Sequence, residues 1–153
     1  MAKKESRRVL IVHGPNLDRL GSREKDIYGD LTLGEIDEDI RNTAEKLGVT
    51  VEIFQSNSEG DLVAKINSAG GAHDFLIINP AAYTHSSHAI RDAIAASKLP
   101  AIEVHLSNVG SRETFRRSSA VAPACVGAIA GFGVFSYLLA LEMAVTMLES
   151  NDE

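Results

Sequence analysis

The residues best equipped for chemistry begin at positions 14–29, which read GPNLDRLGSREKDIYG. This stretch places the amide of Asn16, the guanidinium of Arg23 and the phenol of Tyr28 between glycines at its two ends. A phenol has a reference pKa of about 10, so it accepts a proton near neutral pH only beside positive charge. A guanidinium stays protonated and can supply that charge. The stretch therefore predicts proton transfer or the binding of a small anion.

Further polar side chains follow or end three other apolar runs. Glu103 and His105 alternate along residues 100–105, and side chains two apart in a strand point to the same face. Two interpretations stay open: a buried hydrogen bond between them, or a carboxylate that orients a working imidazole. Other polar residues also lie at the ends of these apolar runs or in the segments that follow them. They are residues 55–58, Asn79, His85, His88, Arg91, Asp92, Asn108, Arg112 and Arg116.

Most of these side chains also have a purely structural interpretation. Tyr28 can cover apolar surface, and Arg23 can be a solvated loop residue. His85 can cap the following helix, and the arginines after position 111 can line a solvated helix face. His13 and His73 adjoin apolar runs, which favours structural roles for both.

The sequence lacks the usual metal and nucleotide motifs. His85, Glu103 and His105 are the residue types of a two-histidine, one-carboxylate metal site, but no HExxH spacing occurs. The glycine patterns of dinucleotide sites and P-loops are also absent. We therefore expect no metal and no required nucleotide, while flavin stays open on these residues alone.

The elements that must position these side chains alternate between strands and helices. Five such repeats predict an α/β fold, a flavodoxin-like doubly wound five-stranded parallel sheet with helices on both faces. Parallel strands share one carboxyl edge, so we expect the polar residues to meet there. The predicted strands are 8–13, 49–54, 74–79, 100–105 and 125–130, and the predicted helices are 32–48, 58–70, 86–97 and 135–148, with a short one near 112–117.

Composition limits the remaining possibilities. We predict a single domain over residues 1–153, with a disordered tail at 1–7 and a frayed end at 149–153. The net charge of −6 gives no support for binding nucleic acid or an anionic membrane. Cys125 is the only cysteine, which excludes an internal disulfide and predicts a buried packing residue. No signal peptide or transmembrane run occurs, so we predict a cytoplasmic protein.

The closing helix at residues 135–148 is apolar around most of its circumference. One face of a sheet cannot cover so much apolar surface. The pattern therefore predicts a subunit interface.

Seven short motifs occur in an order and spacing typical of one enzyme family. They are GPNL at 14–17, LGSRE at 20–24, YG at 28–29, NPAAYTHS at 79–86, IEVHLSN at 102–108, RETFR at 112–116, and GFG at 131–133 with Tyr137. From about Val9 to Leu148 the chain resembles type II 3-dehydroquinate dehydratase. The resemblance implies the flavodoxin-like fold and a homododecamer built as a tetramer of trimers.

The resemblance also implies a reaction. The family dehydrates 3-dehydroquinate to 3-dehydroshikimate by anti elimination through an enolate, with no metal and no cofactor. The step belongs to the shikimate pathway, which leads to chorismate and the aromatic amino acids. This chain is therefore expected to be a lyase of that pathway.

Individual residues match the family's functional positions. Tyr28 matches the base that takes a proton from the carbon next to the ketone, and Arg23 matches the arginine that activates it. His105 matches the acid that protonates the departing hydroxyl, and we expect Glu103 to orient it. Asn16 matches the asparagine that holds a water at the enolate oxygen. The matched substrate-binding positions are Asn79, His85, Leu106, Ser107 and Arg116, with Arg112 near the tyrosine and Asp92 reaching a neighbouring subunit's site.

Three positions depart from the family pattern. His13 stands where many members have asparagine, and Lys25-Asp26 replaces a common proline. His88 stands where a small or apolar residue is frequent. None of these positions matches the base, the acid or the carboxylate clamp.

Two other classes of protein stay open on the residues alone. One is a flavodoxin-like module that binds a small anion without turnover. The other is a structural assembly protein that uses the apolar closing helix. A sensor needs an anion clamp but not a base and an acid, so the set Tyr28, Arg23 and His105 favours the enzyme.

Overall fold

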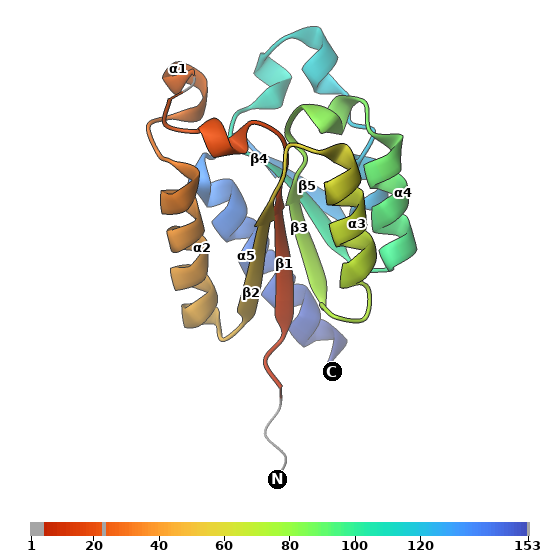
Figure 1. The fold of residues 1–153 in the computed structure, drawn as a ribbon. Helices are drawn as coiled ribbons and strands as arrows, with labels where there is room; N and C mark the ends of the chain where they lie inside the picture. Colours follow the sequence, from red (N-terminus) through yellow and green to blue (C-terminus); the bar gives the residue numbers. More distant parts are fainter. Residues whose placement is uncertain (1–4, 23, 153) are drawn as a thin grey trace.

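Parallel strands form one sheet in the computed structural model, which describes residues 5–22 and 24–152 (Figure 1). In chain order they are β1 (Arg8–His13), β2 (Thr50–Gln55), β3 (Phe75–Asn79), β4 (Ala101–His105) and β5 (Gly127–Ala130). Their order across the sheet is β2-β1-β3-β4-β5, and all neighbours are parallel. This order confirms the predicted doubly wound, flavodoxin-like sheet.

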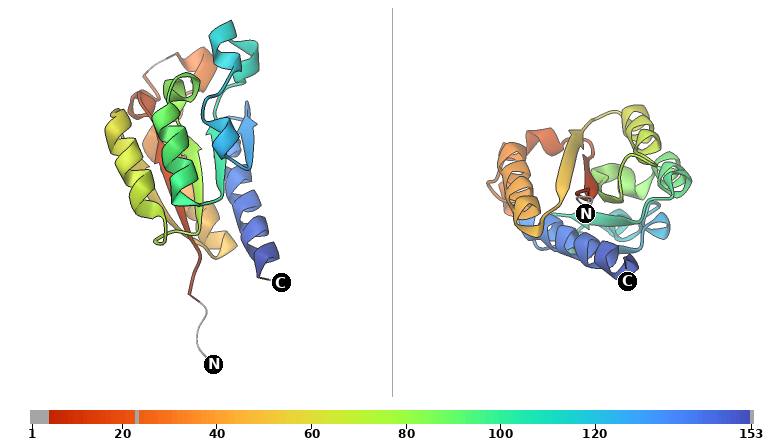
Figure 2. Two further views of the ribbon diagram at one scale, coloured as in Figure 1. Left: turned by 90° about the vertical axis from the view of Figure 1, so that its right-hand side faces the viewer. Right: turned by 90° about the horizontal axis from the view of Figure 1, so that it is seen from below.

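Helices cover both faces of the sheet, and each face has its own apolar cluster. Val9 and Ile11 of β1 pack toward α2 and α5, whereas Leu10 and Val12 pack toward α3 and α4. The view from below in Figure 2 shows the two layers on either side of the sheet. Burial on both faces explains the nearly continuous apolar strands. The covering helices are α2 (Leu33–Leu47), α3 (Glu59–Ala69), α4 (His88–Ser97) and α5 (Val134–Asn151).

Hydroxyl caps decide where three of these helices begin. Thr32, Ser58 and Ser87 each accept a hydrogen bond from the backbone N–H three residues further on. The predicted start of the third helix at residue 86 is therefore wrong. Residues before this cap form a separate 3₁₀ helix, η2 (Ala81–His85), and α4 begins only after Ser87.

The closing helix is longer than the sequence pattern predicts. α5 continues past Leu148 to Asn151, where Asp152 donates its backbone N–H to the last turn. Arg7, just before β1, forms an ion pair with Asp152. Ser6 donates a hydrogen bond to the carbonyl of Gly48 at 3.3 Å. These contacts hold the two ends of the described chain against the body of the fold.

The connections after β1 and β4 carry short helices at the carboxyl edge of the sheet. The connection between β1 and α2 contains η1 (Leu17–Arg19) and α1 (Lys25–Tyr28). The connection between β4 and β5 contains η3 (Val109–Ser111), η4 (Thr114–Arg117) and η5 (Ala122–Ala124). η1, α1, η3 and η4 lie beyond the last residues of the strands, at one end of the molecule (Figures 1 and 2).

Gly14 allows two of these connections to start side by side. Its N–H donates to the carbonyl of Asn79 at 2.7 Å. A Cβ atom at position 14 would lie 2.5 Å from the carbonyl oxygen of Pro80, which no side chain tolerates. Glycine is therefore required where the chain leaves β1 beside the end of β3.

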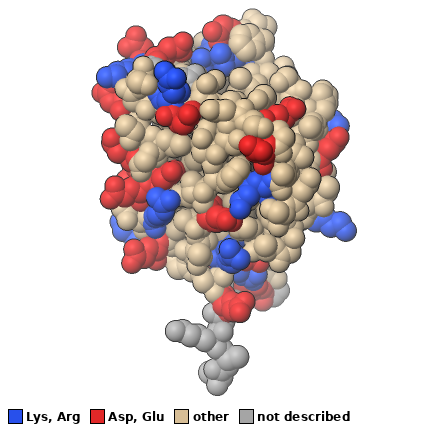
Figure 3. Space-filling model, viewed as in Figure 1, with Lys and Arg blue, Asp and Glu red and all other residues tan. Residues whose placement is uncertain are grey.

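Charged side chains of both signs are mixed over the face in Figure 3, and acidic ones gather on the side of α2. Within the part of the chain that the structure describes, every helix is too short or too polar to span a bilayer.

Cys125, just before β5, is half-buried rather than fully buried as predicted. Its Sγ lies 3.7 Å from the carbonyl oxygen of Val121. Burial, and next the charge of Glu103, raises the pKa of this thiol to about 12. Because the thiolate is the reactive form, Cys125 is a poor nucleophile in the folded protein.

We expect iodoacetamide to alkylate Cys125 at least about a hundredfold more slowly in the folded protein than in urea, because unfolding restores an ordinary thiol pKa. Intact mass spectrometry measures the rate directly, since the chain has one cysteine. Equal rates in the two states would contradict the raised pKa.

Candidate active site

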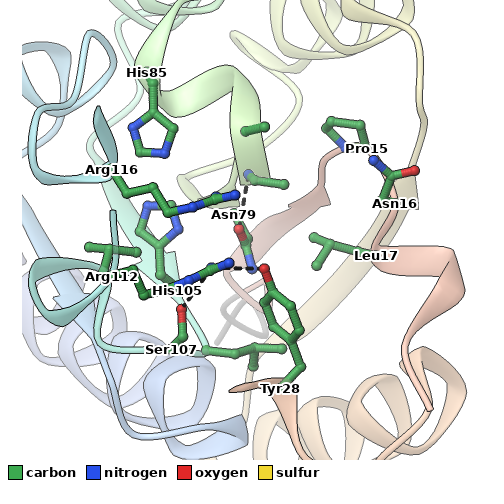
Figure 4. A pocket seen from close by; sticks show the side chains of 14 residues that line it. Pro15, Asn16, Leu17, Tyr28, Asn79, His85, His105, Ser107, Arg112 and Arg116 are labelled. Carbon is green, nitrogen blue, oxygen red and sulfur yellow. Dashed lines mark hydrogen bonds between the residues drawn. The ribbon is translucent and has the colours of Figure 1, made fainter. Parts of the chain in front are cut away.

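A pocket of about 160 Å³ opens at the carboxyl edge of the sheet, between the connections that follow β1, β3 and β4 (Figure 4). Two arginines and two histidines are among its lining residues, and no aspartate or glutamate is among the described ones. This balance of charge favours an anionic ligand. Of the residues predicted from the sequence, the pocket brings together Asn16, Tyr28, Asn79, His85, His105, Leu106, Ser107, Arg112 and Arg116.

The phenol of Tyr28 meets a guanidinium inside this pocket. Arg112 Nη1 donates to the Tyr28 hydroxyl at 2.8 Å and lies 3.4 Å from Ser107 Oγ (Figure 4). The guanidinium carbon lies 5.1 Å from the centre of the tyrosine ring. A cation in direct contact with the phenolic oxygen stabilises negative charge on that oxygen.

The imidazole of His105 rests against a buried carboxylate. Its Nε2 lies 3.0 Å from Glu103 Oε2 and 3.3 Å from the hydroxyl of Thr84. Both Glu103 and His105 are buried, with 4% and 7% of their surface exposed. The prediction that they share a face of the strand is confirmed, and Nε2 is occupied by the carboxylate.

Glu103 is itself held from the far side. Ser119 Oγ donates to Glu103 Oε1 at 2.7 Å, and the same hydroxyl accepts the backbone N–H groups of Val121 and Ala122. A buried carboxylate is costly unless its lone pairs are used. Here both oxygens have partners, so the position of the His105 ring is tied to the β4–β5 connection.

Asn79 ends β3 with its side chain directed into the pocket wall. Its Oδ1 accepts the backbone N–H of Ala81 at 3.0 Å. Ala81 has φ of 53°, a left-handed conformation that costs energy for a residue with a Cβ. The amide of Asn79 supports this strained turn, which starts η2 beside the pocket.

His85 and Arg116 close the outer part of the pocket. His85 Nδ1 lies 2.9 Å from the carbonyl oxygen of Ser118, and its ring packs edge-on against Phe115. His85 therefore does not cap the following helix, which corrects one of the structural interpretations. Arg116 Nε donates to Glu113 Oε2 at 2.6 Å and lies over the pocket beside His105 (Figure 4).

Asn16 lies across the pocket from His105 and Arg112 (Figure 4). Its φ of 66° is left-handed, a conformation that asparagine tolerates better than most residues. Its backbone N–H donates to Asn57 Oδ1 at 2.9 Å, so the loop after β2 supports the loop after β1.

Two of the predicted residues that the structure describes stand apart from the pocket lining. Glu103 lies behind His105, with Oε2 3.0 Å from Nε2. Asp92 is exposed on α4, where it pairs with Arg91 at 3.0 Å. A further predicted residue, Arg23, lies outside the described residues.

The remaining histidines are not part of the pocket. His13 is fully buried, and His73 lies 3.1 Å from Glu52, which agrees with the structural roles predicted for both. His88 is exposed in the first turn of α4. Over residues 5–22 and 24–152, no three His, Cys, Asp or Glu side chains are grouped in a way that could hold a metal ion.

Sequence reasoning did not select two supporting residues, and it named a third, Asn57, only within residues 55–58. Thr84 stands inside the NPAAYTHS motif, so its neighbours could have pointed to it. Ser119 lies in a loop without a distinctive pattern. The contacts of Asn57 and Ser119 arise only from the packing of distant segments.

Comparisons with known proteins point to one group. The family described as dehydroquinase class II matches residues 7–145. The chain is 58% identical to a 3-dehydroquinate dehydratase of Geotalea daltonii over 134 residues, which are 88% of this chain and 93% of the relative. It is 53% identical to that of Thermoanaerobacter pseudethanolicus over 145 residues, 95% of this chain and 97% of the relative. A type II dehydroquinase crystal structure from Butyrivibrio crossotus matches with a TM-score of 0.89 and 43% identity, covering 91% of this chain and 97% of that one.

Proposed function

The chain belongs to the class II dehydroquinase family, and we propose that it dehydrates 3-dehydroquinate to 3-dehydroshikimate as a lyase of the shikimate pathway. The observation that carries the proposal is the pairing of a phenol with a guanidinium and of an imidazole with a carboxylate at one pocket. An elimination needs both a base and an acid, and these two pairs can supply them. A module that only binds an anion would need the arginines alone.

In the proposed first step, Tyr28 takes the proton from the carbon next to the ketone. The electrons of the broken C–H bond move toward the ketone oxygen and form an enolate. Arg112, 2.8 Å from the phenolic oxygen, supports this step because it stabilises the phenolate that must accept the proton. Arg23 is proposed to assist the same oxygen, as the family resemblance implies.

In the proposed second step, the carbon–oxygen bond to the leaving hydroxyl breaks. The enolate electrons return to form the carbon–carbon double bond, and His105 gives the hydroxyl a proton, so that water leaves. Glu103 supports this role because its carboxylate, 3.0 Å from Nε2, stabilises the protonated ring and holds its orientation. The proton lost to Tyr28 and the proton given by His105 balance the reaction.

The remaining pocket residues fit a substrate with one carboxylate and several hydroxyls. We assign the carboxylate and hydroxyls to His85, Arg116, Asn79 and the backbone N–H groups of Leu106 and Ser107, all of which line the pocket. Asn16, also on the lining, is proposed to hold a water at the enolate oxygen, where a hydrogen-bond donor lowers the energy of developing charge.

We also propose that the protein assembles, as the resemblance implies, into twelve copies. An exposed apolar stripe on and before α5 supports assembly, because large apolar side chains in water favour an interface. The stripe consists of Phe132, Phe135, Leu139 and Met143, which are 61%, 62%, 43% and 46% exposed. Asp92, exposed on α4, is proposed to reach a neighbouring subunit's site.

The cytoplasmic location of the protein stays a prediction.

The proposed function is tested by adding 3-dehydroquinate to the purified protein with a chelator and recording ultraviolet absorbance. We expect the absorbance of a conjugated enone to grow at a rate that the chelator does not change. The absence of enone with the parent protein would overturn the proposed function.

Tyr28→Phe keeps the ring and removes the base, so its kcat should fall by about a hundredfold or more in the same assay. An unchanged rate in Tyr28→Phe would overturn the assignment of the base.

His105→Ala is expected to lower kcat by about a hundred- to ten-thousandfold, because the leaving hydroxyl then departs without a proton donor. Substrate binding, measured by calorimetry on the variant, should persist. His88→Ala, an exposed histidine in the first turn of α4, serves as the matched control. A large loss of binding with an unchanged rate on bound substrate would instead make His105 a binding residue.

A further inference from the structure

Ser119 lies between η4 and η5, on a segment that no step of the proposed mechanism uses. The backbone on both sides of this serine is fixed to η2. The N–H of Ala120 donates to the carbonyl of Thr84 at 2.7 Å. The carbonyl oxygen of Ser118 lies 2.9 Å from His85 Nδ1. The main chain therefore fixes the position of Ser119 before its side chain makes any contact.

The hydroxyl of Ser119 has every one of its bonding positions in use. A hydroxyl carries one hydrogen and two lone pairs. The backbone N–H groups of Val121 and Ala122, which can only donate, lie 3.1 and 2.9 Å from Oγ and take the lone pairs. The single hydrogen is then directed to Glu103 Oε1, 2.7 Å away. Donor and acceptor chemistry thus gives this hydroxyl one orientation, toward the carboxylate.

The carboxylate of Glu103 transmits this orientation to the imidazole of His105. An ionised carboxylate only accepts hydrogen bonds. Since Ser119 occupies Oε1, Oε2 is the oxygen that accepts from His105 Nε2, at 3.0 Å. Glu103 and His105 are only 4% and 7% exposed, so water has little access to replace a lost bond. The serine hydroxyl therefore restricts rotation of the carboxylate and, through it, of the ring.

We propose that Ser119 is a positioning residue for the acid of the reaction. Its hydroxyl holds the Glu103 carboxylate with Oε2 toward the imidazole, so that His105 keeps the orientation in which it protonates the leaving hydroxyl. Ser119 is not one of the residues that line the pocket, so it acts through Glu103. The proposal rests on the proposed function in one respect, that His105 is the acid.

Ser119→Ala is the first test, because it removes the hydroxyl and retains the backbone contacts to η2. We expect kcat to fall about ten- to hundredfold, the effect of one hydrogen bond to a charged group. KM should stay within about threefold of the parent value, because the pocket lining is unchanged. An unchanged kcat, or a rise in KM with kcat preserved, would contradict the proposal.

Two further variants separate the hydroxyl from the substitution itself. Ser119→Thr keeps a hydroxyl, so its kcat should stay within about threefold of the parent. Ser68→Ala serves as the control, because it removes an exposed hydroxyl on α3 that bonds only to the carbonyl of Lys65 in its own helix. Equal losses of kcat in Ser119→Ala and Ser119→Thr would show that the hydroxyl has no role.

The link through Glu103 is tested by combining the change with Glu103→Ala. In that background Ser119→Ala should leave kcat unaltered, because the carboxylate on which the hydroxyl acts is gone. An equal fall of kcat in both backgrounds would mean that Ser119 acts only by supporting the N–H groups of Val121 and Ala122, which would overturn the proposal.

A readout without turnover separates this proposal from the proposed function. In the proton NMR spectrum of the parent protein we expect a downfield signal from His105 Nε2–H, identified by its absence in His105→Ala. Ser119→Ala should speed the exchange of this proton with water at least about tenfold, because the carboxylate that accepts it is no longer fixed. Ser68→Ala should leave the exchange rate unchanged.

The outcomes of the two kinds of measurement are distinct. No such signal in the parent, or equal exchange rates in the parent and Ser119→Ala, would overturn the positioning role. If the parent protein failed to turn over 3-dehydroquinate, the proposed function would fail, while the exchange rates would still decide whether Ser119 fixes the His105 ring.

Discussion

The pairing of β1 with β3 at the centre of the sheet is the contact on which the site depends. Where the two strands end, the N–H of Gly14 donates to the backbone carbonyl oxygen of Asn79 at 2.7 Å. A Cβ atom at position 14 would overlap the carbonyl group of Pro80. The loop that bears Asn16 and Tyr28 and the turn that starts at Asn79 therefore leave the sheet from one point. The same register aligns His13, which contacts Tyr137 and Asp37, with Asn79 in the pocket wall.

Burial of the charged groups in the site restricts the positions that they can occupy. Glu103 is a carboxylate inside the sheet, a position that costs several kcal/mol unless hydrogen bonds compensate. His105 and Ser119 provide those bonds, so the imidazole cannot turn away without exposing an unpaired charge. Arg112 has an analogous constraint, because Tyr28 and Ser107 hold a guanidinium that is 11% exposed. The positions of the proposed acid and base follow from these electrostatic requirements.

Much of this architecture could be predicted from local patterns. Apolar runs located the strands to within about two residues. The capping box at Thr32 and the cap at Ser58 located the starts of two helices. These predictions succeeded because the signals act between residues close in sequence. The start of α4 could not be predicted in this way. Ser86 and Ser87 are both capable caps, and the folded chain uses Ser86 to end η2 and Ser87 to start α4.

For the site, the sequence by itself determined the residue types, their motifs and the alternation of Glu103 with His105, since a strand repeats every two residues. The family resemblance indicated that Arg112 lies near Tyr28, and the tertiary structure showed the hydrogen bond between these two residues, which are 84 positions apart. Only the tertiary structure decided that Ser119 and Thr84 complete the surroundings of Glu103 and His105. It also joined Asp37, His13 and Tyr137, which lie on three separate elements. Local patterns record only the preferences of neighbouring residues, whereas these contacts exist because the packing of sheet and helices brings distant side chains within hydrogen-bond distance.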